Sequence, residues 1–139
     1  MGHHTFTSIR VHIVFGTANL IPDDIQPQLW AYMAGVAKNI GSVVYAVNGA
    51  RDHTHVFVGV PANATVSEVV QKIKANSSRW LHEQCGMPNF AWQEGFGAFS
   101  VSISHTDHTV EYIRNQSDHH KRAGYGEELA RILSKHRLA

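Results

Sequence analysis

Apolar and polar positions alternate near the start of the chain, which predicts a β-strand over residues 8–15 with one buried face. The residues expected on that face are all apolar, namely Ile9, Val11, Ile13 and Phe15. The spacing then changes to three and four residues over residues 25–40, which indicates an amphipathic helix with Gly41 as its stop.

The next signals describe two strands that are close in sequence. Residues 43–47 predict a short strand, and Asn48-Gly49 after it is typical of a tight hairpin turn. A third strand runs over residues 53–60 and ends at Pro61, because proline cannot donate a hydrogen bond to a β-ladder. We therefore expect these two strands to be neighbours in a sheet.

A second helix and a fourth strand follow. Either Thr65 or Ser67 can cap a helix within residues 65–84, whose apolar side chains recur at helical spacing. A connection over residues 86–97 combines glycines with aromatic residues. It leads to a stretch of clean alternation over residues 99–104, which predicts a strand.

Two helices close the chain. Thr106 or Asp107 can cap a helix over residues 108–120, and a last helix covers residues 126–136. The order βαββαβ predicts an α+β, ferredoxin-like fold with a four-stranded antiparallel sheet and two helices on one face. The additional C-terminal helices would cover the other face or an edge, within a single domain of residues 1–139.

Size and composition narrow the class of protein. With 139 residues, 43% hydrophobic and 17% charged, the chain is expected to fold as a globular domain. No apolar run approaches the roughly 18 residues that span a bilayer, and the N-terminus lacks the order of a signal peptide. Cys85 is the one cysteine, so no intrachain disulfide is possible. These features predict a cytoplasmic protein without a membrane partner.

The charge of the chain argues against binding duplex DNA through bulk electrostatics, because the net charge is only +1 with eleven neutral histidines. A nucleic-acid contact would need a local patch of cations. The candidates for phosphate contacts with a hairpin or a single strand are Lys72, Lys74, Arg79, Arg114, Lys121 and Arg122. The alternative is an ordinary solvated surface.

His53 and His55 are the first candidates for chemistry. Side chains two positions apart on a strand point the same way, so both imidazoles oppose the apolar face that Val56 and Val58 form. They would project from the sheet face away from the helix-packed core. His12 is on the corresponding side of the first strand and would either orient a phosphate or lie beside the site. A solvated histidine pair is the alternative.

Tyr112 and Gln116 are one helical turn apart and therefore share a helix face. Two histidines and one oxygen ligand can hold a divalent metal ion, and a nearby tyrosine can attack a phosphodiester that the metal polarises. The combination indicates DNA strand cleavage through a covalent phosphotyrosine. The alternative for Tyr112 is a position at the edge of the core.

The glycine-rich connection also contains aromatic side chains. Gly95 and Gly97 separate Trp92, Phe96 and Phe99, which suggests a tight backbone path into the fourth strand. Exposed aromatic rings there could stack on unpaired bases. For Phe96 and Phe99 we expect core packing instead.

Taken together, these motifs resemble the single-tyrosine HUH transposases, the small transposases of bacterial insertion sequences and of repetitive-palindrome-associated elements. The similar segments cover nearly the whole chain and comprise residues 11–15, 52–58, 67–81, 92–102 and 111–120. Thr54 departs from the family by standing where a bulkier hydrophobic residue is common, and we expect it to point away from the metal.

The resemblance implies a role for each candidate. His53, His55 and Gln116 would bind Mg²⁺ or Mn²⁺, and Tyr112 would be the nucleophile that leaves a 5′-phosphotyrosine and a free 3′-hydroxyl. A second transesterification would rejoin strands without external energy. The implied substrate is single-stranded DNA with an imperfect hairpin near the element ends. The implied assembly is a homodimer, in which the tyrosine helix often completes the metal site of the other subunit.

Three other functions remain open at the level of sequence. A domesticated hairpin-DNA binder that does not cleave would keep the fold. A zinc hydrolase built on His53 and His55 would need a third strong ligand, such as His105 or His120. An RNA-recognition sheet would share the order of elements, but its Lys/Arg-Gly-aromatic signature is absent from residues 53–60.

Overall fold

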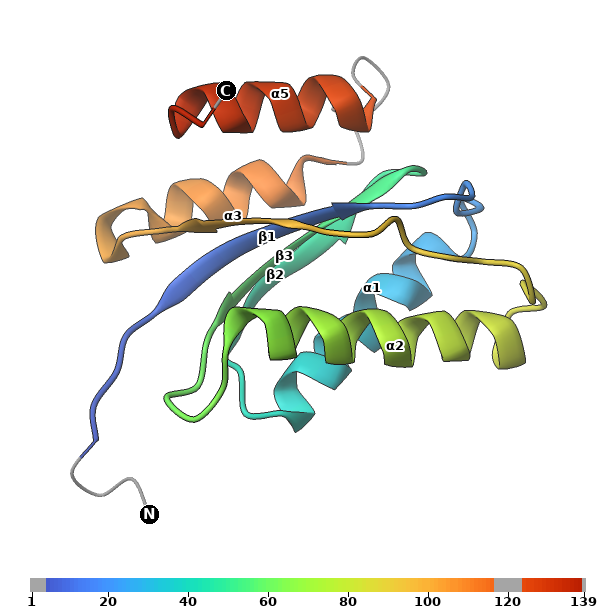
Figure 1. Cartoon of the computed structure of the whole chain (residues 1–139), viewed down its shortest axis with the longest axis horizontal. Helices are drawn as coiled ribbons and strands as arrows, with labels where there is room; N and C mark the ends of the chain where they lie inside the picture. The colour runs from blue at the N-terminus through green and yellow to red at the C-terminus, as the bar shows by residue number, and fades with distance from the viewer. Residues whose placement is uncertain (1–4, 117–123, 139) are drawn as a thin grey trace.

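A computed structural model of the chain describes residues 5–116 and 124–138, in which an antiparallel sheet lies between two layers of helices (Figure 1). The elements in chain order are β1 (Arg10–Gly16), α1 (Gln26–Asn39), β2 (Val44–Gly49), β3 (His53–Gly59), α2 (Val66–Gln84), β4 (Gly97–Ser100), the 3₁₀ turn η1 (Ile103–His105), α3 (Thr106–Arg114) and α5 (Tyr125–Lys135). The strand order within the described residues is β2-β3-β1-β4. This order confirms the predicted ferredoxin-like fold.

The two central strands bring distant parts of the sequence side by side. β1 pairs with β3 so that Val14 lies opposite His55 and His12 lies opposite Phe57. β4 pairs with the other edge of β1, where His12 lies opposite Phe99. The site residues of β1 and β3 are therefore fixed by a continuous ladder rather than by loops.

One face of the sheet carries the main hydrophobic core against α1 and α2. The strands contribute the alternating apolar residues expected from sequence except Ile9, which precedes β1 and is 50% exposed, and the helices contribute buried residues at helical spacing. The fully buried members of this core include Ile13, Phe15, Ile21, Leu29, Met33, Val56, Val58, Ile73 and Leu81. Of the two possible caps of α2, Thr65 is the one used, since it exchanges hydrogen bonds with Glu68 in a capping box.

The opposite face of the sheet is covered by α3 and α5, as Figure 1 shows. α5 rests on the sheet through a small apolar cluster in which Ile132 packs with Val14 and Phe99. The sequence left open whether the C-terminal helices cover the other face of the sheet or one of its edges. In the structure they cover the face. The histidines of this face are consequently buried.

Asn48 and Gly49 do not form the predicted hairpin turn, because both are paired residues of β2, opposite His55 and Thr54. The turn instead comprises residues 50–52. Asn48 is held in the strand because its Nδ2 donates to two carbonyls at the end of α3. A side chain at Gly49 would collide with the backbone of Thr54 and with the ring of Trp30.

Two predictions about the fourth strand and its connection are wrong. The strand ends at Ser100 and not at residue 104, because the chain turns into η1, where Ile103 is 70% exposed. Phe96 is 40% exposed and therefore not a core residue. Phe99 is buried as expected, on the face that carries the histidines.

The third helix begins two residues before its predicted start, and its predicted caps are wrong. Thr106 and Asp107 are the first helical residues, and His105 occupies the cap position without a side-chain hydrogen bond. α3 ends at Arg114, and the predicted end at residue 120 lies outside the described residues. Across the described ranges no helix has both the length and the apolar character needed to cross a bilayer.

Candidate active site

The alternation of β3 places His53 and His55 on the face beneath α3 and α5. Both side chains are fully buried, with ring centroids 5.1 Å apart. Thr54 between them points to the other side, where its hydroxyl donates to the carbonyl of Asn48. Thr54 therefore lies on the opposite side of the strand from the two histidines, and its orientation relative to a metal ion stays a prediction.

Each histidine is oriented through its Nδ1 atom. His53 Nδ1 lies 2.7 Å from Asp52 Oδ1, and the other oxygen of Asp52 accepts a hydrogen bond from the backbone N–H of Tyr125 at 3.0 Å. His55 Nδ1 lies 2.7 Å from His12 Nε2. Because an ionised carboxylate can only accept, the neutral form of His53 would carry its proton on Nδ1 and keep a lone pair on Nε2.

The pKa values of His12 and Asp52 agree with their roles in orienting His55 and His53. Burial, with Coulombic contributions from His136 and Lys135, lowers the pKa of His12 from 6.5 to about 4, so its ring is neutral at physiological pH. Partial burial opposes ionisation of Asp52, but the hydrogen bonds from His53 and from the Tyr125 backbone hold its pKa below the usual value.

α3 brings the tyrosine to the histidines. The ring centroid of Tyr112 lies 5.7 Å from that of His55 and 6.2 Å from that of His12, in edge-to-face geometry. Gln116 follows the end of α3 and is fully buried. The predicted residues of the strand and of the helix, about 60 positions apart, therefore meet in one chain.

Gln116 also contacts the last helix. Its Nε2 donates to Oε1 of Glu128 at 3.4 Å, and the same oxygen lies 4.0 Å from His55 Nε2. Glu128 is 1% exposed, and Arg131 approaches its other oxygen at 3.7 Å. Burial raises the pKa of Glu128, although the charges of His53 and Arg131 oppose the shift.

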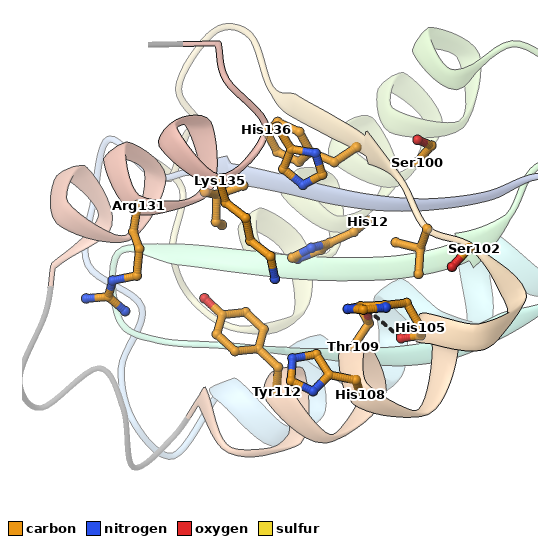
Figure 2. Close-up of a pocket in the computed structure, with 13 residues that line it drawn as sticks. His12, Ser100, Ser102, His105, His108, Thr109, Tyr112, Arg131, Lys135 and His136 are labelled. Atoms are coloured by element: carbon orange, nitrogen blue, oxygen red, sulfur yellow. Dashed lines mark hydrogen bonds between the residues drawn. The ribbon is translucent and has the colours of Figure 1, made fainter.

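A pocket of about 470 Å³ opens beside Tyr112, between α3, α5 and the edge strand β4 (Figure 2). Figure 2 shows Tyr112 extending from α3 towards α5, the helix that carries Arg131 and Lys135. The described residues that line the pocket include no Asp or Glu. Its histidines are His12, His105, His108 and His136, and its floor includes Phe99 and Ile132. A cavity with this lining can accept a phosphate and an adjoining apolar ring.

The cations predicted to contact DNA are distributed over different parts of the molecule. Lys72 and Arg79 are exposed on α2, on the sheet face opposite to Tyr112, whereas Arg114 is exposed at the end of α3. Lys74 is engaged internally, because its ammonium donates to the carbonyls of Gln93 and Gly95. Burial lowers the pKa of Lys74, although Glu94 opposes the shift.

Lys121 and Arg122, the remaining predicted cations, lie outside the described residues. The cations that do line the Tyr112 pocket, Arg131 and Lys135, were missed by the sequence analysis, and so was Glu128. A signal for Glu128 exists in the sequence. It is three residues after Tyr125 and four before Ile132, so it falls on the apolar stripe of its helix, where a carboxylate is unusual.

The donor atoms of this cluster suit a divalent cation. Nε2 of His53 is buried and has no hydrogen-bond partner among the described residues, while its Nδ1 is held by Asp52. This is the usual arrangement of a metal-ligating histidine. His55 and the amide oxygen of Gln116 would complete a set of two nitrogens and one oxygen. Within residues 5–116 and 124–138, no three His, Cys, Asp or Glu side chains are already grouped as a metal site.

Comparison with known proteins shows that the sequence matches one protein family. The family described as "Transposase IS200 like" matches residues 5–116, which include His53, His55, Tyr112 and Gln116. No curated protein gave a significant match. The matched range ends before α5, so Arg131, Lys135 and Glu128 lie outside it.

Two solved structures share the fold at low sequence identity. One is a crystal structure of a presumed transposase from Deinococcus radiodurans R1, at 18% identity and a TM-score of 0.63, covering 84% of this chain and 97% of the other. The second is a REP-associated tyrosine transposase bound to a REP hairpin, at 17% identity and a TM-score of 0.58. That match covers 83% of this chain and 72% of the other.

Proposed function

The chain belongs to the family of IS200-like transposases, and from that premise we propose that it nicks and rejoins single-stranded DNA through a 5′-phosphotyrosine on Tyr112. The observation that carries the proposal is the position of Tyr112. Its ring lies against His55 and lines a pocket that Arg131 and Lys135 also line. A nucleophile, two oriented imidazoles and a cationic pocket thus meet at one place. We take residues 1–139 as one domain for this activity.

The proposed reaction is a pair of balanced transesterifications. The oxygen of Tyr112 bonds to the phosphorus, and the bond from phosphorus to the 3′-oxygen breaks, so that this oxygen leaves as a 3′-hydroxyl. A 3′-hydroxyl from another DNA end then attacks the phosphotyrosine and releases Tyr112. One phosphodiester is replaced by one phosphotyrosine and restored, so no external energy source is needed. Arg131 and Lys135 would offset the phosphate charge.

A phenol has a pKa of about 10, so the site must favour loss of the Tyr112 proton during attack. We propose that His53, His55 and Gln116 hold Mg²⁺ or Mn²⁺, which when bound would polarise the scissile phosphate. The buried Nε2 of His53 and its Asp52 partner support this assignment. His12 would keep His55 in the ligating orientation.

For the substrate, we propose single-stranded DNA that carries a hairpin near the cleavage position. The REP hairpin bound to the structural neighbour supports this choice. Lys72, Arg79 and Arg114 are exposed and could contact the hairpin phosphates, and Lys121 and Arg122 remain candidates for the same role. Lys74 is the weakest candidate because backbone carbonyls already occupy its ammonium.

The experiment that tests the function is a cleavage assay on labelled single-stranded hairpin DNA from the flanks of the gene. Wild-type protein with Mg²⁺ or Mn²⁺ should give a covalent protein–DNA adduct on a denaturing gel. Tyr112→Phe should lower the adduct yield by at least about a thousandfold, because it removes the nucleophile. Tyr45→Phe, a tyrosine beside Phe57 on a neighbouring strand, is the matched control and should retain the yield.

The same assay addresses the alternative function. Tight binding of the hairpin without any adduct, with either metal ion, would identify a domesticated DNA-binding protein that does not cleave. An adduct that persists in Tyr112→Phe would exclude Tyr112 as the nucleophile. An adduct that forms equally well in EDTA would remove the metal ion from the proposal.

A further inference from the structure

The pocket beside Tyr112 is larger than the phosphate group that the proposed reaction brings to it. Its volume is about 470 Å³, within the range of about 300–1,000 Å³ for cavities that bind whole small molecules. In Figure 2, Tyr112 and Arg131 lie at one end of the pocket, and Ser102 and His105 lie at the other. The far end can therefore hold a chemical group that is attached to the phosphate.

The α5 side of the pocket suits an anion. Lys135 and Arg131 line the pocket from this helix, and the described residues of the lining include no Asp or Glu. Arg131 also lies 3.7 Å from a carboxylate oxygen of Glu128, so Lys135 is the cation better placed for a phosphate. Figure 2 shows the side chain of Lys135 extending from α5 into the pocket.

The remainder of the pocket suits a planar, uncharged ring. His105 and His108 line it, with ring centroids 5.3 Å apart in edge-to-face geometry. Phe99 and Ile132 supply a buried apolar floor, and the ring of His136 stacks on Phe99 with centroids 4.6 Å apart. Imidazole and phenyl rings are surfaces on which nucleobases stack.

We propose that this pocket binds one unpaired nucleotide of the DNA strand, next to the cleaved phosphate, with the base against His105 and His108 and the phosphate at Lys135. The inference rests on the proposed function and adds to it a subsite for the substrate. A base inside a duplex is stacked and paired, so only an unpaired nucleotide can place its ring in a pocket. The subsite therefore favours single-stranded DNA at the cleavage position.

Part of this subsite lies outside the range that matches the family. Lys135 and His136 follow residue 116, the last residue of that range. The other part, with His105 and His108, lies within the range. The complete subsite therefore depends on the docking of this chain's own α5.

The lining predicts little discrimination among the four bases. The polar groups beside the rings include the hydroxyls of Ser100 and Ser102, which can both donate and accept hydrogen bonds. Stacking also tolerates any base, because every base has a π-face. We therefore expect the subsite to position the strand at Tyr112 rather than to read its sequence.

The first test is titration of the ¹⁵N-labelled full chain with dAMP in EDTA, followed through the backbone amide resonances. EDTA removes divalent ions, so the titration measures the pocket without cleavage. The affinity for dAMP should exceed that for inorganic phosphate and that for deoxyadenosine by at least about tenfold, because dAMP engages both parts of the pocket. The amides of Val101 and Ile132, two residues of the lining, should shift.

Two pairs of variants locate the bound nucleotide. Lys135→Gln should weaken dAMP binding by at least about threefold, whereas Lys38→Gln, the same change in the last turn of α1, should leave it unchanged. The double variant His105→Ala/His108→Ala should weaken binding by at least about fivefold. His82→Ala, at an exposed histidine of α2, should leave it unchanged. All five side chains are exposed, so the variants are expected to fold.

The second test places an abasic residue in the hairpin DNA, on either side of the cleaved phosphate in turn. At one of these positions the wild-type rate of adduct formation should fall by at least about fivefold. In His105→Ala/His108→Ala the abasic residue should have a much smaller effect, because the base has lost the surface on which it stacks. In His82→Ala the effect should equal that in the wild type.

The outcomes separate this inference from the proposed function. Equal affinities for dAMP and inorganic phosphate would show an anion site alone and overturn the inference. Adduct formation that is insensitive to the abasic residue, or equally sensitive in the wild type and the double variant, would also overturn it while the proposed function stands. Binding of dAMP in the pocket without an adduct from any hairpin DNA would overturn the cleavage function and retain the nucleotide site.

Discussion

The imidazole of His12 helps to orient His55 through its Nδ1 atom. The two rings share a hydrogen bond of 2.7 Å and stack with centroids 5.0 Å apart. His12 can accept the proton of His55 Nδ1 only while Nε2 of His12 is deprotonated. Burial lowers the pKa of His12 to about 4, which keeps the ring neutral and leaves one of its two nitrogens free to accept.

This shift predicts a pH dependence of stability in the metal-free protein. In the unfolded chain His12 takes up a proton near pH 6.5, and in the folded chain only near pH 4. The unfolded state therefore binds more protons between these values, and stability falls as the pH drops from 6.5 towards 4. His12→Gln should retain about 2–3 kcal/mol of the unfolding free energy that the wild type loses between about pH 7.5 and pH 4.5.

Urea unfolding in EDTA at the two pH values measures this difference. His105→Gln, a substitution of an exposed histidine, is the control and should lose as much stability as the wild type. Equal losses in wild type and His12→Gln would show that the folded-state pKa of His12 is not depressed.

At the scale of elements, the docking of α5 depends on a glycine at the end of β1. The ring of Tyr125 stacks on His53 with centroids 5.3 Å apart and lies directly over Gly16. The backbone N–H of Tyr125 donates to Asp52, the residue that orients His53. The first turn of α5 is thereby joined to the residues that orient one proposed ligand.

Gly16→Ala should weaken this docking. A methyl group at Gly16 would overlap the ring of Tyr125, so the ring must leave His53 or the backbone must shift. We expect a loss of about 1–3 kcal/mol in unfolding free energy, as for other overpacked sites. In Gly16→Ala, amide hydrogen exchange should show that protection relative to the wild type falls more in α5 than in α2.

A second glycine provides the matched control. Gly126 is in the first turn of α5, and a methyl group added there would meet no atom of another segment within 4 Å. Gly126→Ala should therefore stabilise the protein by about 0.4–1 kcal/mol, through a less flexible unfolded chain and a better helix former. Equal protection of α5 in wild type and Gly16→Ala would contradict the role assigned to Gly16.

For the whole molecule, the main question is which chain supplies Tyr112 to each site. In the structure α3 is tied to its own sheet, because Asn48 of β2 donates to the carbonyls of Ile113 and Arg114. Tyr112 consequently lies against His55 of the same chain. The homodimer implied by family resemblance stays a prediction, and each protomer of such a dimer would have its own complete site.

Mixing two inactive variants tests this arrangement. His55→Ala and Tyr112→Phe each lack one required group, and a mixture restores cleavage only if Tyr112 acts on the partner's histidines. We expect no gain in adduct above the level of the separate variants. Light scattering on the same samples gives the oligomeric state. Restored cleavage in the mixture would show that the tyrosine helix is exchanged between subunits.

Local patterns were enough to predict much of the fold and part of the candidate site. The face on which His53 and His55 lie follows from the two-residue period of a strand, since Val56 and Val58 must face the core. The prediction of a hairpin turn at Asn48-Gly49 was wrong. This pair has a strong local preference for a tight turn, but contacts with α3 and Trp30 override that preference. Such contacts cannot be seen in a window of a few residues.

The sequence by itself determined the order of elements, most of the buried faces and the set of candidate reactive side chains, because periodicity and side-chain chemistry are local properties. Only the tertiary structure decided that α5 covers the histidines and that His12 orients His55. It also placed Arg131 and Lys135 in the pocket beside Tyr112, and Glu128 beside Gln116 and His55. These relations depend on the packing of segments that are distant in sequence, and packing follows from the shape of the entire chain.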